Sequence, residues 1–214
     1  MASAVHKLVG EARWKLSALQ KSGEFHTDAE LVTLYKSRLL GYLEYRTAAV
    51  YHATDSVLAA LDGVQNKLLK VVGCSEVEAL LNWKLAPLAM RRDIAMLGLI
   101  HRTVTGKGPS HFRRFFRLRN CTAPSTLWTR RAAKRHHRQL ETQEYTHCPE
   151  LLRRSALGLA RVYNLLPESV VQEDCVKEFQ KKLQELVKKR VEEGSENWNE
   201  TLSPRVPWWK HPLR

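Results

Sequence analysis

Apolar residues recur at helical spacing over residues 28–51, directly after a capping signal. Thr27 and Glu30 have the spacing of a capping box, in which the two side chains bond amides that a helix start leaves without partners. The apolar positions that follow are Leu31, Leu34, Tyr35, Leu39, Tyr42 and Val50. Their spacing predicts one long helix over residues 28–51.

A second helix is predicted directly after the first. Thr54 or Asp55 can cap its start, and Gly73 can end it, because glycine readily adopts the left-handed conformation of a helix C-terminus. One apolar stripe lies between these signals and consists of Leu58, Leu61, Val64, Leu68 and Val71. On periodicity alone, these are two ordinary packed helices.

Three other segments have helical patterns. Residues 3–21 are amphipathic, and residues 85–102 begin with Pro87, which suits a first helical turn, and are apolar on enough sides to run through the core. After Pro167 breaks the preceding helix, an apolar stripe continues towards Gly194. It consists of Val176, Phe179, Leu183, Leu186 and Val187. This stripe fits packing within the chain or binding to a partner.

The pattern as a whole predicts an all-α protein, an irregular bundle of about six helices with no sizeable sheet. We expect a helical region over 1–105, a basic linker or helical segment over 106–148, a C-terminal helical region over 149–193 and an irregular tail over 194–214. Three prolines and the lack of periodicity predict that the tail packs poorly. Its tryptophans either dock on the helical body or stack on bases. They are Trp198, Trp208 and Trp209.

Composition indicates the compartment. The chain has 214 residues and an apolar fraction of 43%, which suffices for one real core. No apolar run approaches the roughly 18 residues of a membrane span, and residues 1–20 are amphipathic rather than a signal-peptide core. We therefore expect an intracellular protein, nuclear or cytoplasmic, that is neither secreted nor membrane-spanning. Its four cysteines are widely spaced, which favours reduced thiols.

Positive charge is concentrated in one stretch. The chain carries 35 Lys+Arg and 22 Asp+Glu, a net charge of +13. Residues 94–140 contain no acid, and their eleven cations leave only +2 for all other residues. Such a concentrated field attracts polyanions and releases their counterions on binding.

We expect nucleic-acid contacts from nine of these cations. They are Arg113, Arg114, Arg117, Arg119, Arg130, Arg131, Lys134, Arg135 and Arg138. Guanidinium groups bind phosphate oxygens bidentately, while the phenylalanines among them can anchor in the core. Arginine-rich segments suit A-form or hybrid duplexes, which are read by shape and phosphate. The alternatives are a solvated basic surface and a nuclear-import signal at residues 130–138.

Particular residues also occur in a specific order. LEYRTAAVYH and LDGVQNKLLKVVG are followed by LAPLAMRRDIAMLGLIHR and then by ARVYNLLPESVVQEDCVKEF. This order over residues 30–190 resembles the region that follows the catalytic palm in the reverse transcriptases of non-LTR (LINE-type) retrotransposons. The residues that carry the resemblance include Tyr35, Glu44, Tyr45, Gln65, Arg91, Arg92, Asn164, Pro167 and Phe179. Tyr163 stands where the family pattern has tryptophan.

The resemblance implies a thumb-like N-terminal half and a C-terminal helical region. Together these would form a non-catalytic C-terminal fragment that binds RNA or an RNA–DNA duplex and works beside the palm and fingers of a polymerase. We expect no enzyme activity, because phosphoryl transfer needs metal-binding palm aspartates, normally an adjacent pair, and no two of the five aspartates are adjacent. The alternatives are a stand-alone basic helical module and a truncated element copy without selected activity. The oligomeric state is open.

We expect neither a metal nor a cofactor. The candidate metal ligands are Cys121, His136, His137, His147 and Cys148. A zinc knuckle needs two cysteines two or three residues apart, and the sequence has no such pair. GKGPS, at residues 106–110, lacks the serine or threonine that directly follows the lysine of a phosphate-binding loop.

Overall fold

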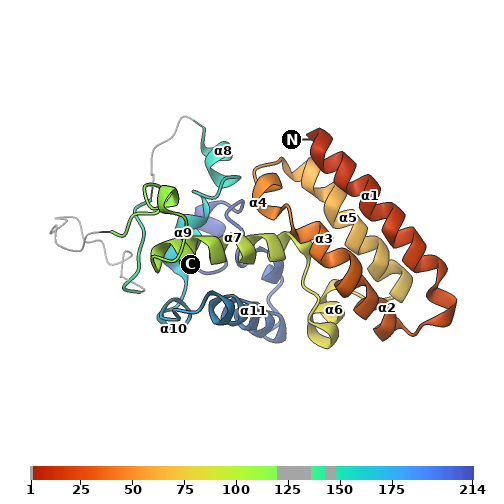
Figure 1. Ribbon diagram of the computed structural model, residues 1–214. Coiled ribbons are helices and arrows are strands. Elements are labelled where there is room, and N and C mark those ends of the chain that lie inside the picture. The colour runs from red at the N-terminus through yellow and green to blue at the C-terminus, as the bar shows by residue number, and fades with distance from the viewer. Residues whose placement is uncertain (1, 120–135, 143–147) are drawn as a thin grey trace. The chain divides into compact units, whose positions relative to one another are not determined.

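The computed structural model describes residues 2–119, 136–142 and 148–214, and these residues form helices without a sheet (Figure 1). The predicted all-α class is therefore confirmed. The chain divides into two compact units, Met1–Arg92 and Asp93–Arg214. The division falls inside helix α7 (Leu88–Val104), whereas the sequence placed a boundary after residue 105. The first turns of α7 belong to the first unit because Arg91 and Arg92 pair with acids there.

The first unit is a helical bundle in which α1 and α5 lie side by side (Figure 1). Its elements are α1 (Ala2–Lys21), the 3-10 turn η1 (Gly23–Phe25), α2 (Asp28–Tyr35), the π-helical turn η2 (Lys36–Leu40), α3 (Gly41–Glu44), α4 (Thr47–Val50), α5 (Asp55–Val72) and α6 (Glu76–Trp83). One side of the amphipathic helix α1 is buried through Val5, Leu8, Ala12 and Leu16, and Leu19 is partly buried beside them. They share one core with Leu58, Leu61, Val64 and Leu68 of the predicted α5 stripe. Val71, the last residue predicted in that stripe, is exposed instead.

Two predicted helix signals in this unit are confirmed. Thr27 Oγ1 accepts a hydrogen bond from the Glu30 amide at 3.4 Å, and Glu30 Oε2 accepts one from the Thr27 amide at 2.8 Å. This capping box lowers the pKa of Glu30, chiefly through the bond from the Thr27 backbone. At the C-terminus of α5, Gly73 has a φ of 68° and ends the helix.

The predicted single helix over 28–51 is wrong at its C-terminal end. The chain stays helical from α2 through η2 to Glu44 and then turns, because Arg46 takes φ −101° and ψ 14°. Helix α4 is a separate turn. The sequence reading also missed α6, although Ser75 and Glu78 form a second capping box at its start. The same S-x-x-E signal could have predicted it.

The second unit contains the rest of α7 and the C-terminal elements. These are η3 (Ser110–Phe112), α8 (Pro149–Arg153), α9 (Leu159–Leu165), α10 (Glu168–Val171), α11 (Val176–Glu192), η4 (Trp198–Glu200) and η5 (Trp208–Lys210). The predicted stripe of α11 faces the core, with Phe179, Leu183 and Val187 each fully buried. Pro167 separates α9 from α10, as predicted, because proline cannot continue the preceding helix.

The C-terminal tail packs against the second unit, so the prediction of a poorly packed tail is wrong. Leu202 and Leu213 are buried, as is the imidazole of His211. The tryptophans contribute less than these residues, since Trp208 is 38% and Trp209 71% exposed. Two spaced leucines hold the segment without any helical periodicity, which is why the sequence pattern did not show it.

Candidate nucleic-acid interface

The described part of the basic stretch presents four arginines to solvent just after η3. Arg113, Arg114, Arg117 and Arg119 are all exposed. They lie in the acid-free stretch of residues 94–140, so no carboxylate of their own segment neutralises them. Their positive field therefore adds up along one short segment.

Aromatic and backbone contacts hold this segment in place. Phe116 is 6% exposed and anchors it, as expected, whereas Phe115 is 45% exposed. Arg114 lies over the Phe115 ring, 4.6 Å from its centroid, in a cation–π contact. Arg113 donates a hydrogen bond to the carbonyl oxygen of Gly106 at 2.9 Å. These contacts fix the backbone while the cations stay at the surface.

The basic segment also pairs with a second stretch of chain. The Arg119 amide donates to the Gln139 carbonyl at 2.8 Å, and the Glu141 amide donates to the Arg117 carbonyl at 2.9 Å. The pairing is a short antiparallel bridge that no sequence pattern had predicted. Since side chains alternate in extended backbone, Arg117 and Arg119 point to one face and Leu118 to the other.

The second stretch, residues 136–142, is bound to α9 and α10 by hydrogen bonds. His136 donates from Nε2 to the Tyr163 carbonyl at 2.9 Å. The His137 amide donates to Glu168 Oε2 at 3.0 Å, and the imidazole of His137 bonds the other oxygen. These bonds lower the pKa of Glu168, chiefly through the His137 side chain. His136 and His137, near the C-terminal end of the basic stretch, are therefore attached to α9 and α10.

Arg138 differs from the other predicted contact residues because its guanidinium is used inside the protein. It donates to Asp174 Oδ1 at 2.6 Å and to the carbonyls of Val171 at 2.9 Å and Glu173 at 3.3 Å. The bond from Arg138 lowers the pKa of Asp174. The side chain of Arg138 is only 20% exposed, and its bonds stabilise the fold.

Several predicted residues lie outside the described part of the chain. They are the predicted contact residues Arg130, Arg131, Lys134 and Arg135 and the candidate metal ligands Cys121 and His147. Among the residues that the structure describes, no cluster of three or more His, Cys, Asp or Glu side chains is placed to hold a metal ion.

The family landmarks of the first unit meet in a buried polar network. Tyr35, fully buried, donates from its hydroxyl to Gln65 Oε1 at 3.3 Å, and Gln65 Nε2 donates to the Ala86 carbonyl at 3.0 Å. Burial raises the pKa of Tyr35, which keeps the phenol protonated as a donor. Tyr45, by contrast, is 87% exposed.

The arginine pair at the start of α7 forms ion pairs with two other helices. Arg92 binds Asp62 of α5 bidentately, at 2.7 and 2.9 Å, and Arg91 pairs with Glu44 of α3. Five of the landmarks, together with Asp62, therefore connect α2, α3, α5 and the first turn of α7. Their described roles are structural.

The landmarks of the second unit surround a buried histidine that the sequence reading did not single out. His101 stacks on Phe179 with ring centroids 3.9 Å apart. Its Nδ1 accepts from the Tyr163 hydroxyl at 2.9 Å, and its Nε2 donates to the Glu173 carbonyl at 2.5 Å. Burial lowers the pKa of His101, so the ring is neutral. Nothing in the sequence indicated these partners, because His101 is a single histidine in an otherwise apolar part of its helix.

Asn164 connects the same core to the basic stretch. Its Oδ1 accepts from the Leu140 amide at 2.7 Å, and its Nδ2 donates to the Leu140 carbonyl at 2.8 Å. The side chain therefore continues the bridge that starts at Arg117 and Arg119. This landmark residue orients the predicted interface.

Comparison of the whole chain with family models, curated proteins and solved structures found no match. No helix in the described ranges is long and apolar enough to cross a membrane. The geometry of the site is thus the basis for assigning a function.

Proposed function

We propose that this chain is a non-catalytic, thumb-like part of a non-LTR reverse transcriptase-like protein, which holds RNA or an RNA–DNA duplex by its phosphates. The observation that carries the proposal is the exposed, backbone-anchored group Arg113, Arg114, Arg117 and Arg119 in a stretch free of acids. The order of landmarks at Tyr35, Gln65 and Asn164 supports the family assignment.

The dimensions of the segment suit a duplex backbone. Arg113 and Arg114 lie in the turn after η3, and Arg117 and Arg119 lie in the bridged segment that follows. A duplex carries one phosphate charge per about 1.7 Å of axis, so phosphates are closely spaced beside such a segment. The long arginine side chains can therefore reach different phosphates. The Debye length at physiological salt is about 8 Å, so the fields of neighbouring arginines overlap, whereas those of the two ends of the segment are largely screened from each other.

The test is the salt dependence of binding to an RNA–DNA duplex. We expect log Kobs against log salt to have a slope of roughly −4 to −7, which corresponds to about five to eight phosphates contacted by the full basic stretch. Replacing Arg113, Arg114, Arg117 and Arg119 by Gln should flatten the slope by about 3 to 4, or about 0.9 for each cation lost.

A matched control uses four exposed lysines of α11. They are Lys177, Lys181, Lys188 and Lys189. Their replacement by Gln removes the same charge, but three of them already pair with glutamates of their own helix. We expect the control to keep the wild-type slope within about 1. Equal slopes for wild type and the arginine variant would overturn the proposal.

The preference for RNA is tested with duplexes of equal length. Shape recognition predicts tighter binding to A-form RNA and to the hybrid than to B-form DNA. Equal affinity for all three at one salt concentration would refute the RNA-specific part of the proposal and would favour a general basic module.

A further inference from the structure

The side of helix α1 (Figure 1) that is turned away from the core of the first unit carries one large aromatic residue, Trp14, which is 73% exposed. Lys7 and Lys21 lie seven residues before and after it, so the three side chains share one face of the helix. Each lysine is about 10.5 Å from Trp14 along the helix axis. This face therefore presents an indole between two cations.

An open hollow lies beside the indole. Its volume is about 420 Å³, and it is lined by Gly10, Glu11, Trp14 and Lys15. Beyond its own helix backbone and the two adjoining residues, a Cβ atom added at Gly10 would have no neighbour within 4 Å. The space one turn before Trp14 is thus unfilled, and a flat group of the size of a nucleobase can lie there against the indole.

Tyr42 of α3 holds the two polar residues that line the hollow. Its hydroxyl donates a hydrogen bond to a carboxylate oxygen of Glu11, and Lys15 Nζ lies 4.1 Å from the centroid of its ring. Glu11 is the only acid of α1. The rim of the hollow is therefore held in place, and the one carboxylate that could repel a phosphate is directed at Tyr42.

The cations of α1 outnumber its acid and remain available to an outside ligand. Four cations minus one acid give the helix a net charge of +3, and the cations are Lys7, Arg13, Lys15 and Lys21. Lys7, Arg13 and Lys21 are exposed, and no ion pair within the described ranges of the chain engages them. Such a surface attracts a ligand that has both negative charge and a flat ring.

These features favour a single-stranded nucleic acid over other polyanions. A duplex keeps its bases stacked inside, whereas an unpaired base can stack on an aromatic side chain while its phosphates contact cations. A protein interface needs an apolar centre, but Trp14 is the one large hydrophobic side chain exposed along Ala2–Lys21.

We propose that this face of α1 binds single-stranded nucleic acid, with one base stacked on Trp14 in the hollow and nearby phosphates held by Lys7 and Lys21. The site differs from the proposed duplex interface in its residues and in the form of nucleic acid that it takes. The inference therefore goes beyond the proposed function and does not require it.

The experiment compares the affinity of the full chain for a short oligoadenylate with its affinity for an abasic strand of the same length and charge, by fluorescence anisotropy. We expect the strand with bases to bind about tenfold more tightly, because stacking of one base contributes roughly that factor. Trp14→Ala should reduce this ratio to about 1, and Trp14→Phe should keep most of it. Gly10→Gln should also lower the ratio, because it fills the hollow at an exposed helical position where glutamine is well tolerated.

The matched control is Trp209→Ala. Trp209 is 71% exposed and also adjoins a lysine, but it lies in the second unit, and its loss should keep the ratio. Combined replacement of Lys7 and Lys21 by Gln should weaken binding of both strands. It should flatten the salt slope by about 1.4, or about 0.7 for each cation, as expected for single strands.

The Gln variant of Arg113, Arg114, Arg117 and Arg119 should lose duplex affinity but keep the ratio, so failure of the two proposals can be distinguished. A wild-type ratio of 1, or a ratio that Trp14→Ala leaves unchanged, would overturn the inference. So would displacement of the labelled oligoadenylate by a polyglutamate peptide of equal charge as effectively as by unlabelled oligoadenylate, which would indicate an acidic protein partner.

Discussion

Replacing Gln65 by Leu tests whether the landmark residues of the first unit stabilise it through their polar network. Gln65 is 2% exposed, and its amide joins the Tyr35 hydroxyl to the Ala86 carbonyl. Leucine has a similar volume and keeps α5 helical, so the substitution removes two hydrogen bonds with little change in packing. It leaves the phenol and the carbonyl buried without their partner.

The structure sets the size of the effect. An unsatisfied buried group costs about 1–3 kcal/mol, and the bond from Tyr35, at 3.3 Å, belongs at the lower end of that range. Burial of the leucine side chain returns about 1 kcal/mol relative to the amide. We therefore expect Gln65→Leu to lower the free energy of unfolding by about 1–3 kcal/mol.

Unfolding in guanidinium chloride, followed by circular dichroism, measures this loss of unfolding free energy. Asn66→Leu is the matched control, since it makes a comparable change on an exposed position of the same helix and should change stability by less than about 0.5 kcal/mol. In the Tyr35→Phe background, the Gln65→Leu loss should shrink by about 1 kcal/mol, because no orphaned hydroxyl remains. A loss for Gln65→Leu as small as that of the control would refute the role of the network.

Other expected outcomes follow from single contacts. Thr27→Ala and Ser75→Ala should each cost about 1 kcal/mol in urea unfolding, because each removes a helix cap, and unchanged midpoints would contradict both caps. Asp62→Asn should cost about 1–3 kcal/mol in thermal unfolding, because it leaves the Arg92 guanidinium, whose side chain is 8% exposed, without its charge partner. Burial holds the pKa of His101 below its ordinary 6.5, so the unfolded chain takes up that proton first. Stability should therefore be full above about pH 6.5 and fall as the pH drops below it, and a flat profile between pH 7 and 5 would contradict this.

Two of the helices that the sequence predicted had both a periodic stripe and a terminal signal. Helix α5 had an apolar stripe and a glycine, and α11 had a stripe that ended near Gly194. The break after Glu44 was missed because no proline or glycine marks it, and the apolar positions continue in register beyond it. Periodicity reports which face is buried, but it does not report where the backbone turns.

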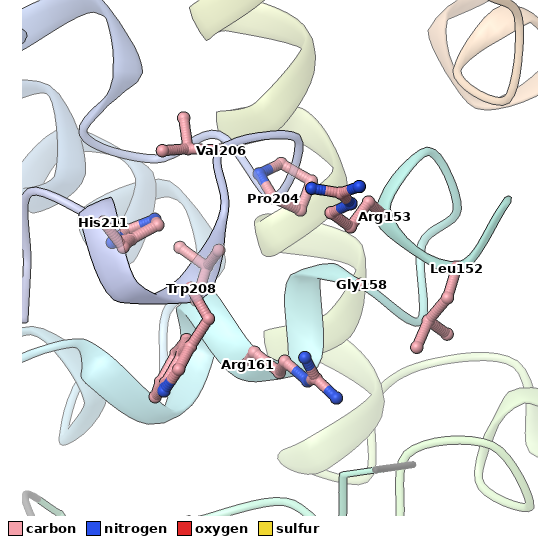
Figure 2. A pocket seen from close by; sticks show the side chains of 9 residues that line it. Leu152, Arg153, Gly158, Arg161, Pro204, Val206, Trp208 and His211 are labelled. Atoms are coloured by element: carbon pink, nitrogen blue, oxygen red, sulfur yellow. The ribbon is translucent and has the colours of Figure 1, made fainter. Parts of the chain in front are cut away.

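The candidate site was predictable in its charges but not in its geometry. The acid-free stretch identified the exposed arginines, yet nothing in it separated Arg113 from Arg138. That difference depends on Asp174 and on two carbonyls from the α10–α11 connection, which are distant in sequence. The cavity lined by α8, α9 and the C-terminal tail (Figure 2) was hidden for the same reason, since its lining residues come from segments that have no common pattern.

The separation of roles within the basic stretch follows from its lack of acids. The cations there find no carboxylate within the stretch itself, so their ion pairs come from outside it. Arg138 pairs with Asp174, and His137 pairs with Glu168. Glu173, the other carboxylate of the α10–α11 connection, pairs with Lys182. The arginines at 113–119 are held by main-chain bonds and an aromatic contact instead, and their side chains stay exposed. A folded protein gains little stability from such a cluster, because like charges repel. Under the proposed function, the benefit of the arrangement is binding to an external polyanion, and the salt slope of binding is the quantity that tests it.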